Sequence, residues 1–159
     1  MFPVHRKKFK ESKYFEDFSI GETFYIPSRT QTDALFAAFQ LASGDNHPIH
    51  YDLEYCKSLG FPGLLAHGMQ VMIQTAPGAG DFPHVVEDSL VAITEISSRF
   101  LKPVFSGDTL YPQLEVVELT PGRTTGVVTL RSTVHNQRDE LCMEGRIKTL
   151  LKRRHPASG

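Results

Sequence analysis

The sequence predicts an α+β fold, built as a single domain in which one long antiparallel β-sheet covers an apolar helix. Its 159 residues suit one domain, since domains usually hold roughly 100–200 residues. The pattern is mainly helical over residues 33–76 and mainly strand-like over residues 90–151. The helical part ends in a segment that is apolar over much of its circumference, and such a helix must be buried. No internal repeat or interdomain linker interrupts these two zones.

Three helices are expected in the first zone. Apolar residues recur at helical spacing before Gly44, which marks the end of the first helix. A second short helix begins after Asp52, a favourable N-cap residue, and ends at Gly60. The third and most apolar helix runs from about 66 to 76, where Pro77 closes it.

The second zone predicts the strands of the sheet. Apolar and polar residues alternate over four stretches, as expected when one face of a sheet is buried and the other meets solvent. Gly107-Asp108, Pro121-Gly122 and residues 136–139 mark the turns, and an earlier strand is expected around residues 23–30. The residues predicted to face inward are Leu90, Ala92, Thr94, Ile96, Ser98 and Phe100, then Leu110, Leu114 and Val116, then Val128, Leu130, Ser132 and Val134, and last Leu141, Met143, Ile147 and Leu151.

Composition and charge exclude several classes of protein. Hydrophobic residues make up 40% and charged residues 22%, which is typical of a folded globular protein and not of a disordered one. With 17 Lys and Arg against 18 Asp and Glu, the net charge is −1, so no large positive field is available to bind nucleic acid. The longest apolar run, residues 34–39, is far shorter than the roughly 20 residues that cross a bilayer. We therefore expect neither a nucleic acid nor a membrane partner.

The basic residues gather near both ends of the chain. This pattern predicts a basic N-terminal segment 1–13, a folded domain 14–152 and a C-terminal tail 153–159. The basic ends are solvated tails or, alternatively, a patch that attracts a phosphate-bearing small molecule. No signal-peptide pattern is present, and the two cysteines lack metal-type spacing, so a cytoplasmic location is expected. The basic residues are Arg6, Lys7, Lys8, Lys10, Lys152, Arg153 and Arg154.

Two groups of residues could carry chemistry. Asp45 and His50 lie five apart across a loop that contains Pro48, and a carboxylate beside an imidazole can hold and deprotonate a water molecule. On spacing alone, turn formation explains the same residues at least as well. His67 and Gly68 come at the start of the apolar helix, where unpaired backbone N–H groups suit an anionic oxygen. Gly68 is explained equally well as a place where helix and sheet pack closely.

Other chemistries find less support. His47, His50 and His67, together with Asp45 and Asp52, could act as metal ligands, but the tight spacing of zinc sites such as H-E-x-x-H is missing. We therefore expect no metal. No G-x-S-x-G elbow indicates a nucleophilic serine, and no glycine-rich phosphate loop is present.

Four segments resemble the MaoC-like dehydratases, the (R)-specific enoyl-CoA hydratase family. The motif at Ser43–Asp52, followed by Ala66–Met69, is similar to the signature of that family. The similarity extends to Phe15–Gly21 and Arg99–Leu110, so that it covers residues 14–151. The resemblance implies a hot-dog fold, in which a long antiparallel sheet wraps around a central helix, assembled as a homodimer or a higher homo-oligomer.

The resemblance also implies an activity. Members of the family add water reversibly to a trans-2-enoyl thioester, with no cofactor beyond the acyl-CoA substrate itself. Asp45 and His50 would be the catalytic pair, and the backbone N–H of Gly68 would bind the thioester oxygen. His67 and His47 would lie on the substrate side. His47 stands where the family commonly has Asn, which puts the substrate preference in question and predicts an altered pH profile.

Two rival functions remain open. A thioesterase can share the fold, because a fold alone does not fix a function. Thioesterases of this fold commonly carry an acidic residue on the central helix, whereas residues 69–76 contain no Asp or Glu, which favours hydration. A non-catalytic module that binds acyl thioesters is the second rival, and the intact pair of Asp45 and His50 argues against it. The acyl chain and its delivery by CoA or by a carrier protein are not readable from these motifs.

Overall fold

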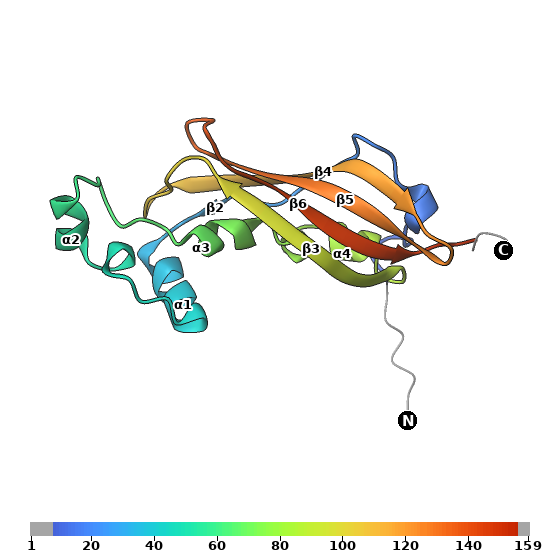
Figure 1. Cartoon of the computed structure of the whole chain (residues 1–159), viewed down its shortest axis with the longest axis horizontal. Coiled ribbons are helices and arrows are strands. Elements are labelled where there is room, and N and C mark those ends of the chain that lie inside the picture. Colours follow the sequence, from blue (N-terminus) through green and yellow to red (C-terminus); the bar gives the residue numbers. More distant parts are fainter. Residues whose placement is uncertain (1–7, 156–159) are drawn as a thin grey trace, which may run out of the picture.

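An antiparallel sheet of six strands forms the framework of the molecule (Figure 1). The computed structural model describes residues 8–155. The strand order is β1-β4-β5-β6-β3, and β2 pairs with β4 beside β1. The predicted α+β class is therefore confirmed. The strands are β1 Thr23–Tyr25, β2 Arg29–Thr30, β3 Leu90–Phe100, β4 Thr109–Pro121, β5 Thr125–Asn136 and β6 Leu141–Lys152.

The three long strands β4, β5 and β6 bury the face that their alternation predicts. Val116, Leu130 and Ile147 lie opposite one another in a single row across the three strands, and all three are at most 1% exposed. The turns fall where glycine, proline and asparagine predicted them. Two hairpins therefore supply most of the buried surface of the sheet.

Strand β3 departs from its prediction. Ile96 pairs with Ile147 in the same row, yet Ile96 is 50% exposed and Phe100 is 51% exposed. The predicted inward face of this strand is wrong for the isolated chain, because β3 lies at the edge of the sheet and its apolar side chains are left uncovered there. An apolar edge strand exposes unpaired backbone N–H and C=O groups, to which a strand of another chain can bind.

Helices α1 and α2 form as predicted and stand beyond one end of the sheet (Figure 1). Helix α1, Asp33–Ser43, ends at Gly44, which adopts the left-handed conformation with φ 74°. Helix α2, Leu53–Ser58, begins after Asp52, whose side chain accepts the backbone N–H of Tyr55. The shorter helices are η1 Phe15–Asp17, η2 Pro48–His50, α3 Gly68–Met72, η3 Ile73–Thr75, η4 Pro77–Ala79 and α4 Phe82–Val85.

Helix α3 is shorter than the predicted helix over 66–76. It continues as the 3-10 turn η3, and Ala76 then turns to an extended conformation with ψ 119°. A residue before proline avoids the helical region, which explains the early end before Pro77. The sequence also predicted that the apolar side chains of this helix are buried. That prediction is wrong in part, because Met69 is 63% exposed, whereas the polar Gln70 is 1% exposed.

The core divides into two clusters. The larger one joins α4, Phe15 and Phe18 to the sheet, with Phe82 packed edge-on against Phe24. The second lies beneath the start of α3 and supports the loops that follow α1. Cys56 and Cys142 are both free and buried. The second cluster contains Phe36, Ala66, Val71, Val104, Leu110, Val134, Cys142 and Met143.

The described parts of both basic ends lie against the domain. Lys8 pairs with Asp88 and Lys10 with Asp81, while Arg153 and Arg154 pair with Glu16 and Asp17 on η1. These pairs leave less positive charge free for a phosphate than the sequence alone indicates. Arg6 and Lys7 lie outside the described residues, and the boundaries at 13 and 152 stay predictions. Within residues 8–155, no helix has the length and hydropathy needed to span a bilayer.

Candidate active site

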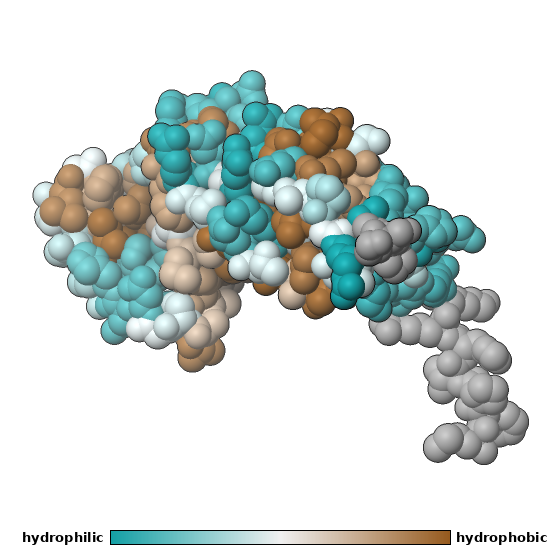
Figure 2. All heavy atoms as spheres, turned by 45° about the vertical axis from the view of Figure 1, so that its right-hand side comes forward, coloured by the Kyte–Doolittle hydropathy of each residue, from teal (hydrophilic) through white to brown (hydrophobic). Residues whose placement is uncertain are grey.

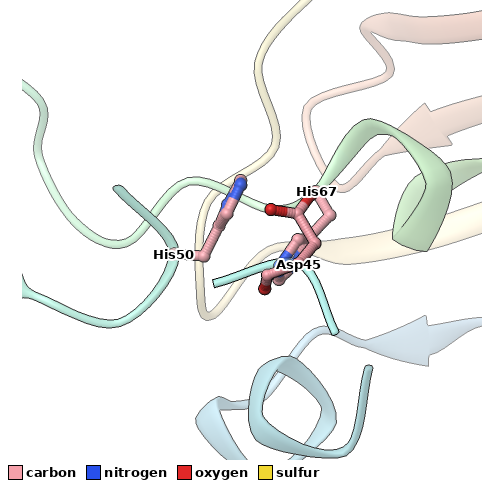
Figure 3. Close-up of side chains that lie close together, drawn as sticks. All are labelled: Asp45, His50 and His67. Atoms are coloured by element: carbon pink, nitrogen blue, oxygen red, sulfur yellow. The ribbon is translucent and has the colours of Figure 1, made fainter. Parts of the chain in front are cut away.

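Three side chains from separate segments meet beside the start of α3 (Figure 3). They are Asp45, which follows α1, His50, which ends η2, and His67, which precedes α3. One carboxylate oxygen and one nitrogen from each ring all lie within 4.8 Å of one another. The structure therefore brings together the predicted pair of Asp45 and His50, and adds His67 to it.

The end of α1 positions Asp45. The backbone N–H of Gly44 donates to the carbonyl of Gln40 at 2.9 Å, and the left-handed turn at Gly44 redirects the chain. The N–H of Asp45 then donates to the hydroxyl of Ser43 at 3.1 Å. These local bonds leave the carboxylate exposed and free to bind a water molecule.

The hydrogen bond from His50 decides which of its nitrogens is available. Nδ1 lies 2.6 Å from the carbonyl oxygen of Leu65, and a carbonyl can only accept, so Nδ1 carries the proton. In the neutral ring Nε2 then keeps its lone pair and can act as a base.

The environment also holds His50 in its neutral form. Burial lowers the pKa of His50 below its usual 6.5, and the neighbouring charges of His67 and His47 lower it further. The bond to Leu65 and the charge of Asp45 act in the opposite direction, and the net shift is downward. A neutral imidazole is the form that accepts a proton from water.

His67 is buried behind this pair. Its side chain is 2% exposed, and its ring stacks on that of His50 with centroids 3.6 Å apart. Nε2 lies 3.2 Å from the backbone oxygen of Asp45, and Nδ1 lies 3.1 Å from Oε1 of Gln70. Because both ring nitrogens are already engaged, the geometry does not favour the predicted substrate contact by this ring.

His47 lies at the outer side of the site. Its Nδ1 accepts the backbone N–H of Ile49 at 3.3 Å, which caps η2. The ring is exposed and lies edge-on to His50 and to Tyr55, with centroids 6.2 and 5.9 Å away. The ring is therefore placed to touch a ligand, and its predicted role on the substrate side stays a prediction.

Gly68, which follows His67 in the chain, lines an open groove of about 400 Å³, and so does Leu65, whose carbonyl is bonded to His50. A Cβ added to Gly68 would come within 3.2 Å of the Phe100 ring, so a side chain here would crowd the groove. The N–H groups of a first helical turn have no intrahelical partner and can bind a ligand oxygen. The other lining residues are Ala66, Val71, Phe100, Leu101, Lys102, Pro103 and Val104.

The hydrogen bonds bear on the metal alternative. A ring nitrogen binds a metal ion through a free lone pair. Both nitrogens of His67 are engaged with oxygen atoms, so an ion held by all three residues would have to displace one of those two bonds. The donor set fits a metal poorly, and the absence of a metal stays a prediction.

Gln31 and Gln70 belong to the site and were missed by the sequence analysis. Gln31 is fully buried between β2 and α1, and its Oε1 accepts Nε2 of Gln70 at 3.1 Å. The available signal was a glutamine inside the most apolar helix. Its partner lies 39 residues away, a separation that no local pattern reveals.

Comparison with known proteins places these features in a family. The family model described as "MaoC like domain" matches residues 17–137. The chain belongs to the MaoC-like domain family. The resemblance seen in the motifs is thereby confirmed. Its residues 43–52 and 66–69, which supply the site, fall inside the matched region.

Solved structures of MaoC-like relatives share the fold. The structure titled monoamine oxidase regulatory protein from Archaeoglobus fulgidus superposes with a TM-score of 0.86 at 32% identity, over 94% of this chain and all of that one. A conserved hypothetical protein from Mycobacterium tuberculosis, described as having a double hot-dog fold, gives a TM-score of 0.73 at 31% identity, over 92% of this chain and 45% of that chain. The hot-dog fold is therefore confirmed.

A curated relative carries a named activity. The mesaconyl-CoA hydratase of Cereibacter sphaeroides is 25% identical over 154 residues, which cover 95% of this chain and 44% of the relative. The chain thus spans less than half the length of that hydratase. The family and these relatives support a hydratase or dehydratase role in general terms.

Proposed function

We propose that this MaoC-like protein adds water reversibly to a trans-2-enoyl-CoA and so forms a 3-hydroxyacyl-CoA. The observation that carries the proposal is the meeting of the Asp45 carboxylate and the His50 ring within 4.8 Å, with the lone pair of His50 left on Nε2. One water molecule bridges two polar atoms at that separation with ordinary hydrogen bonds. A carboxylate and a neutral imidazole together orient that water and take its proton.

The proposed addition begins with a proton transfer from water to His50. Nε2 of His50 takes a proton from the water while the water oxygen forms a bond to C3 of the substrate. The electron pair of the C2–C3 double bond moves toward the thioester carbonyl, whose oxygen becomes enolate-like and accepts the N–H of Gly68. The pair of His50 and Asp45 then returns a proton to C2, so that one water molecule is added and no redox change occurs. A positioned pair of this kind contributes roughly 10²–10⁴ in rate.

The groove beside Gly68 supports a thioester substrate. Its mostly apolar lining suits an acyl chain, and its open mouth leaves room for the pantetheine arm. The hydratase activity named for the Cereibacter relative supports an acyl-CoA as the substrate class. No metal or redox cofactor takes part in the proposal, because the thioester itself activates C3 for addition.

The proposal includes a homodimer joined along β3. This edge strand leaves its apolar side chains uncovered, and Met69 and Ile73 of the neighbouring helical segment are exposed as well. The mycobacterial relative holds a double hot-dog in one chain, and this chain spans 45% of it. A second copy would supply the second unit here and would pair its own β3 with the free edge.

The assay follows the loss of enoyl-thioester absorbance when the purified protein meets trans-2-enoyl-CoA substrates of different length and branching. Asp45→Asn and His50→Ala are each expected to reduce kcat by roughly 10²–10⁴ with little change in fold. His84→Ala is the matched control, because this ring contacts Phe9 rather than the site. Full activity in both site variants would overturn the mechanism.

The same assay separates the rival functions. Release of free CoA thiol without hydration would identify a thioesterase. Tight binding of acyl-CoA without any turnover would identify a binding module. Prior treatment with a chelator is expected to leave the hydration rate unchanged, and strong inhibition by the chelator would establish a metal instead.

A further inference from the structure

A row of buried polar side chains runs behind the catalytic pair. Gln31, Gln70 and His67 are 0%, 1% and 2% exposed, although glutamine and histidine are usually found nearer the surface. A buried polar group destabilises the fold unless it finds a hydrogen-bond partner. The direction of each bond in the row is therefore decided by the partners that are available.

At one end of the row, the direction of the hydrogen bond is fixed. Nε2 of Gln31 donates to the backbone carbonyl of Arg29 at 3.3 Å, and this carbonyl can only accept. The amide oxygen of Gln31 is consequently the atom that accepts Nε2 of Gln70, at 3.1 Å. Turning either amide over would set two oxygen atoms, or two N–H groups, against each other.

The fixed orientation of the Gln70 amide also determines the hydrogen bonds of His67. Oε1 of Gln70 is the atom left beside Nδ1 of His67, at 3.1 Å, so Nδ1 must donate. Nε2 lies 3.2 Å from the backbone oxygen of Asp45, so Nε2 must donate too. A neutral imidazole has one N–H and cannot make both bonds, whereas an imidazolium makes both.

We propose that His67 is a positioning residue that carries a proton on each ring nitrogen. It holds Asp45 in place through the backbone carbonyl and presents a fixed positive charge to the stacked ring of His50. Gln31 and Gln70 enforce this state from behind. The positioning role rests on the proposed function, whereas the charge state of the ring is independent of it.

The surroundings of His67 suit a buried cation. The titratable groups in contact with it are the Asp45 carboxylate, within 4.8 Å, and the His50 ring, stacked at 3.6 Å, with His47 beyond His50. On the side of α1 the ring lies against the uncharged ring of Phe39, with centroids 4.8 Å apart. The carboxylate compensates the charge, and the repulsion between two stacked cations keeps the His50 ring neutral in the resting enzyme, before it takes a proton from water. The pair thus divides into a charged ring and a basic one.

The decisive measurement is two-bond ¹H–¹⁵N NMR of the histidine rings, with His67 assigned by comparison with His67→Asn. In the wild-type protein near neutral pH, both nitrogens of His67 are expected to appear protonated, while His50 shows one protonated and one bare nitrogen. A wild-type His67 ring with a bare nitrogen overturns the inference, whatever the enzyme assay gives. Two protonated nitrogens without any hydratase activity uphold the charge state and reject the proposed function.

The variant Gln70→Met removes the acceptor and keeps the length of the side chain. His67 is then expected to become neutral near neutral pH, and kcat to fall about tenfold with KM changed less than about twofold, because positioning is lost while binding is kept. The acid limb of the kcat/KM profile should also move to higher pH, since removing a nearby positive charge raises the pKa of His50. A merely structural role would leave that limb unmoved.

Gln74→Met is the matched control. Gln74 is also buried on the same helical segment, but its Nε2 donates to the backbone oxygen of Gln70 and takes no part in the row. This variant is expected to leave the NMR pattern of His67 and the acid limb as in the wild type. Equal shifts in both variants would overturn the inference, because they would reflect general loosening of the helix.

Discussion

The chemistry of this site is set by what each histidine ring is bonded to. His50 gives one N–H to the carbonyl of Leu65 and keeps a lone pair, whereas His67 meets an acceptor on each side. Two stacked rings of the same residue type thereby receive opposite tasks. The Asp45 carboxylate lies within 4.8 Å of both rings and is exposed to solvent.

The lowered pKa of His50 predicts the pH dependence of the proposed hydration. The neutral ring is the base, and burial penalises the charged ring, so more acid than usual is needed to protonate it. The acid limb of kcat/KM is therefore expected below pH 6.5, the usual value for histidine. Steady-state kinetics across the acid range measure it. An acid limb well above that value contradicts the assignment of His50 as the base.

Individual site residues could be predicted from the sequence only where they belong to a family motif. The roles of Asp45 and His50 were predicted from the family resemblance, since spacing alone favoured turns. For Gly68, the start of a helix left ligand binding and close packing equally open, and the resemblance decided between them. Gln31 and Gln70 were not predicted, because a pair of amides 39 residues apart has no periodicity. Their importance appears only when both are seen buried and bonded to each other.

Among the elements, α1 matters for the site because of how it ends. Its last turn closes on Gly44 in the left-handed conformation, and the next residue is Asp45. A Cβ added to Gly44 would meet nothing within 4 Å. Any cost of substitution therefore comes from the backbone and not from a clash.

Gly44→Ala is expected to lower the free energy of unfolding by about 1 kcal/mol, the usual cost of a left-handed residue with a Cβ. Gly44→Asn should cost less, since asparagine tolerates this conformation better. Urea denaturation followed by circular dichroism measures both. If alanine proves no worse than asparagine, the left-handed turn is not what stabilises this helix end.

The elements themselves were predicted with mixed success for clear reasons. The helices that end at Gly44 and begin after Asp52 carry local capping signals, and both were placed correctly. The faces of β4, β5 and β6 follow their alternation, because neighbours on both sides fix what is buried. For β3 the same alternation misled, since this strand lies at the edge of the sheet and pairs only with β6 among the described residues.

The whole molecule has an uncovered apolar margin, formed by β3 and the exposed side of α3. Figure 2 shows brown, hydrophobic side chains reaching the surface among teal, hydrophilic ones on the face that it presents. Such margins in single-domain proteins mark contact with another chain. The edge position of β3 makes a second copy, paired strand to strand, the partner that fits the proposal.

Ile96→Lys is expected to break the proposed dimer, because it places a charge on the free edge strand where Ile96 is half exposed. Light scattering after gel filtration should give the wild type twice the chain mass of 17.8 kDa and the variant the single chain mass. Tyr111→Lys is the control, since Tyr111 is 48% exposed but lies on β4, inside the sheet order. A wild type that runs at the single chain mass contradicts the dimer.

In Figure 1, α1 and α2 lie at one extreme of the long axis, and the described ends of the chain lie toward the other. A purification tag or a fused protein module joined through either described end would therefore branch off on the side of the molecule away from α1 and α2. The same layout allows the protein to be tethered to a sensor chip by one end for ligand titration, with the reactive pocket pointing into the flow.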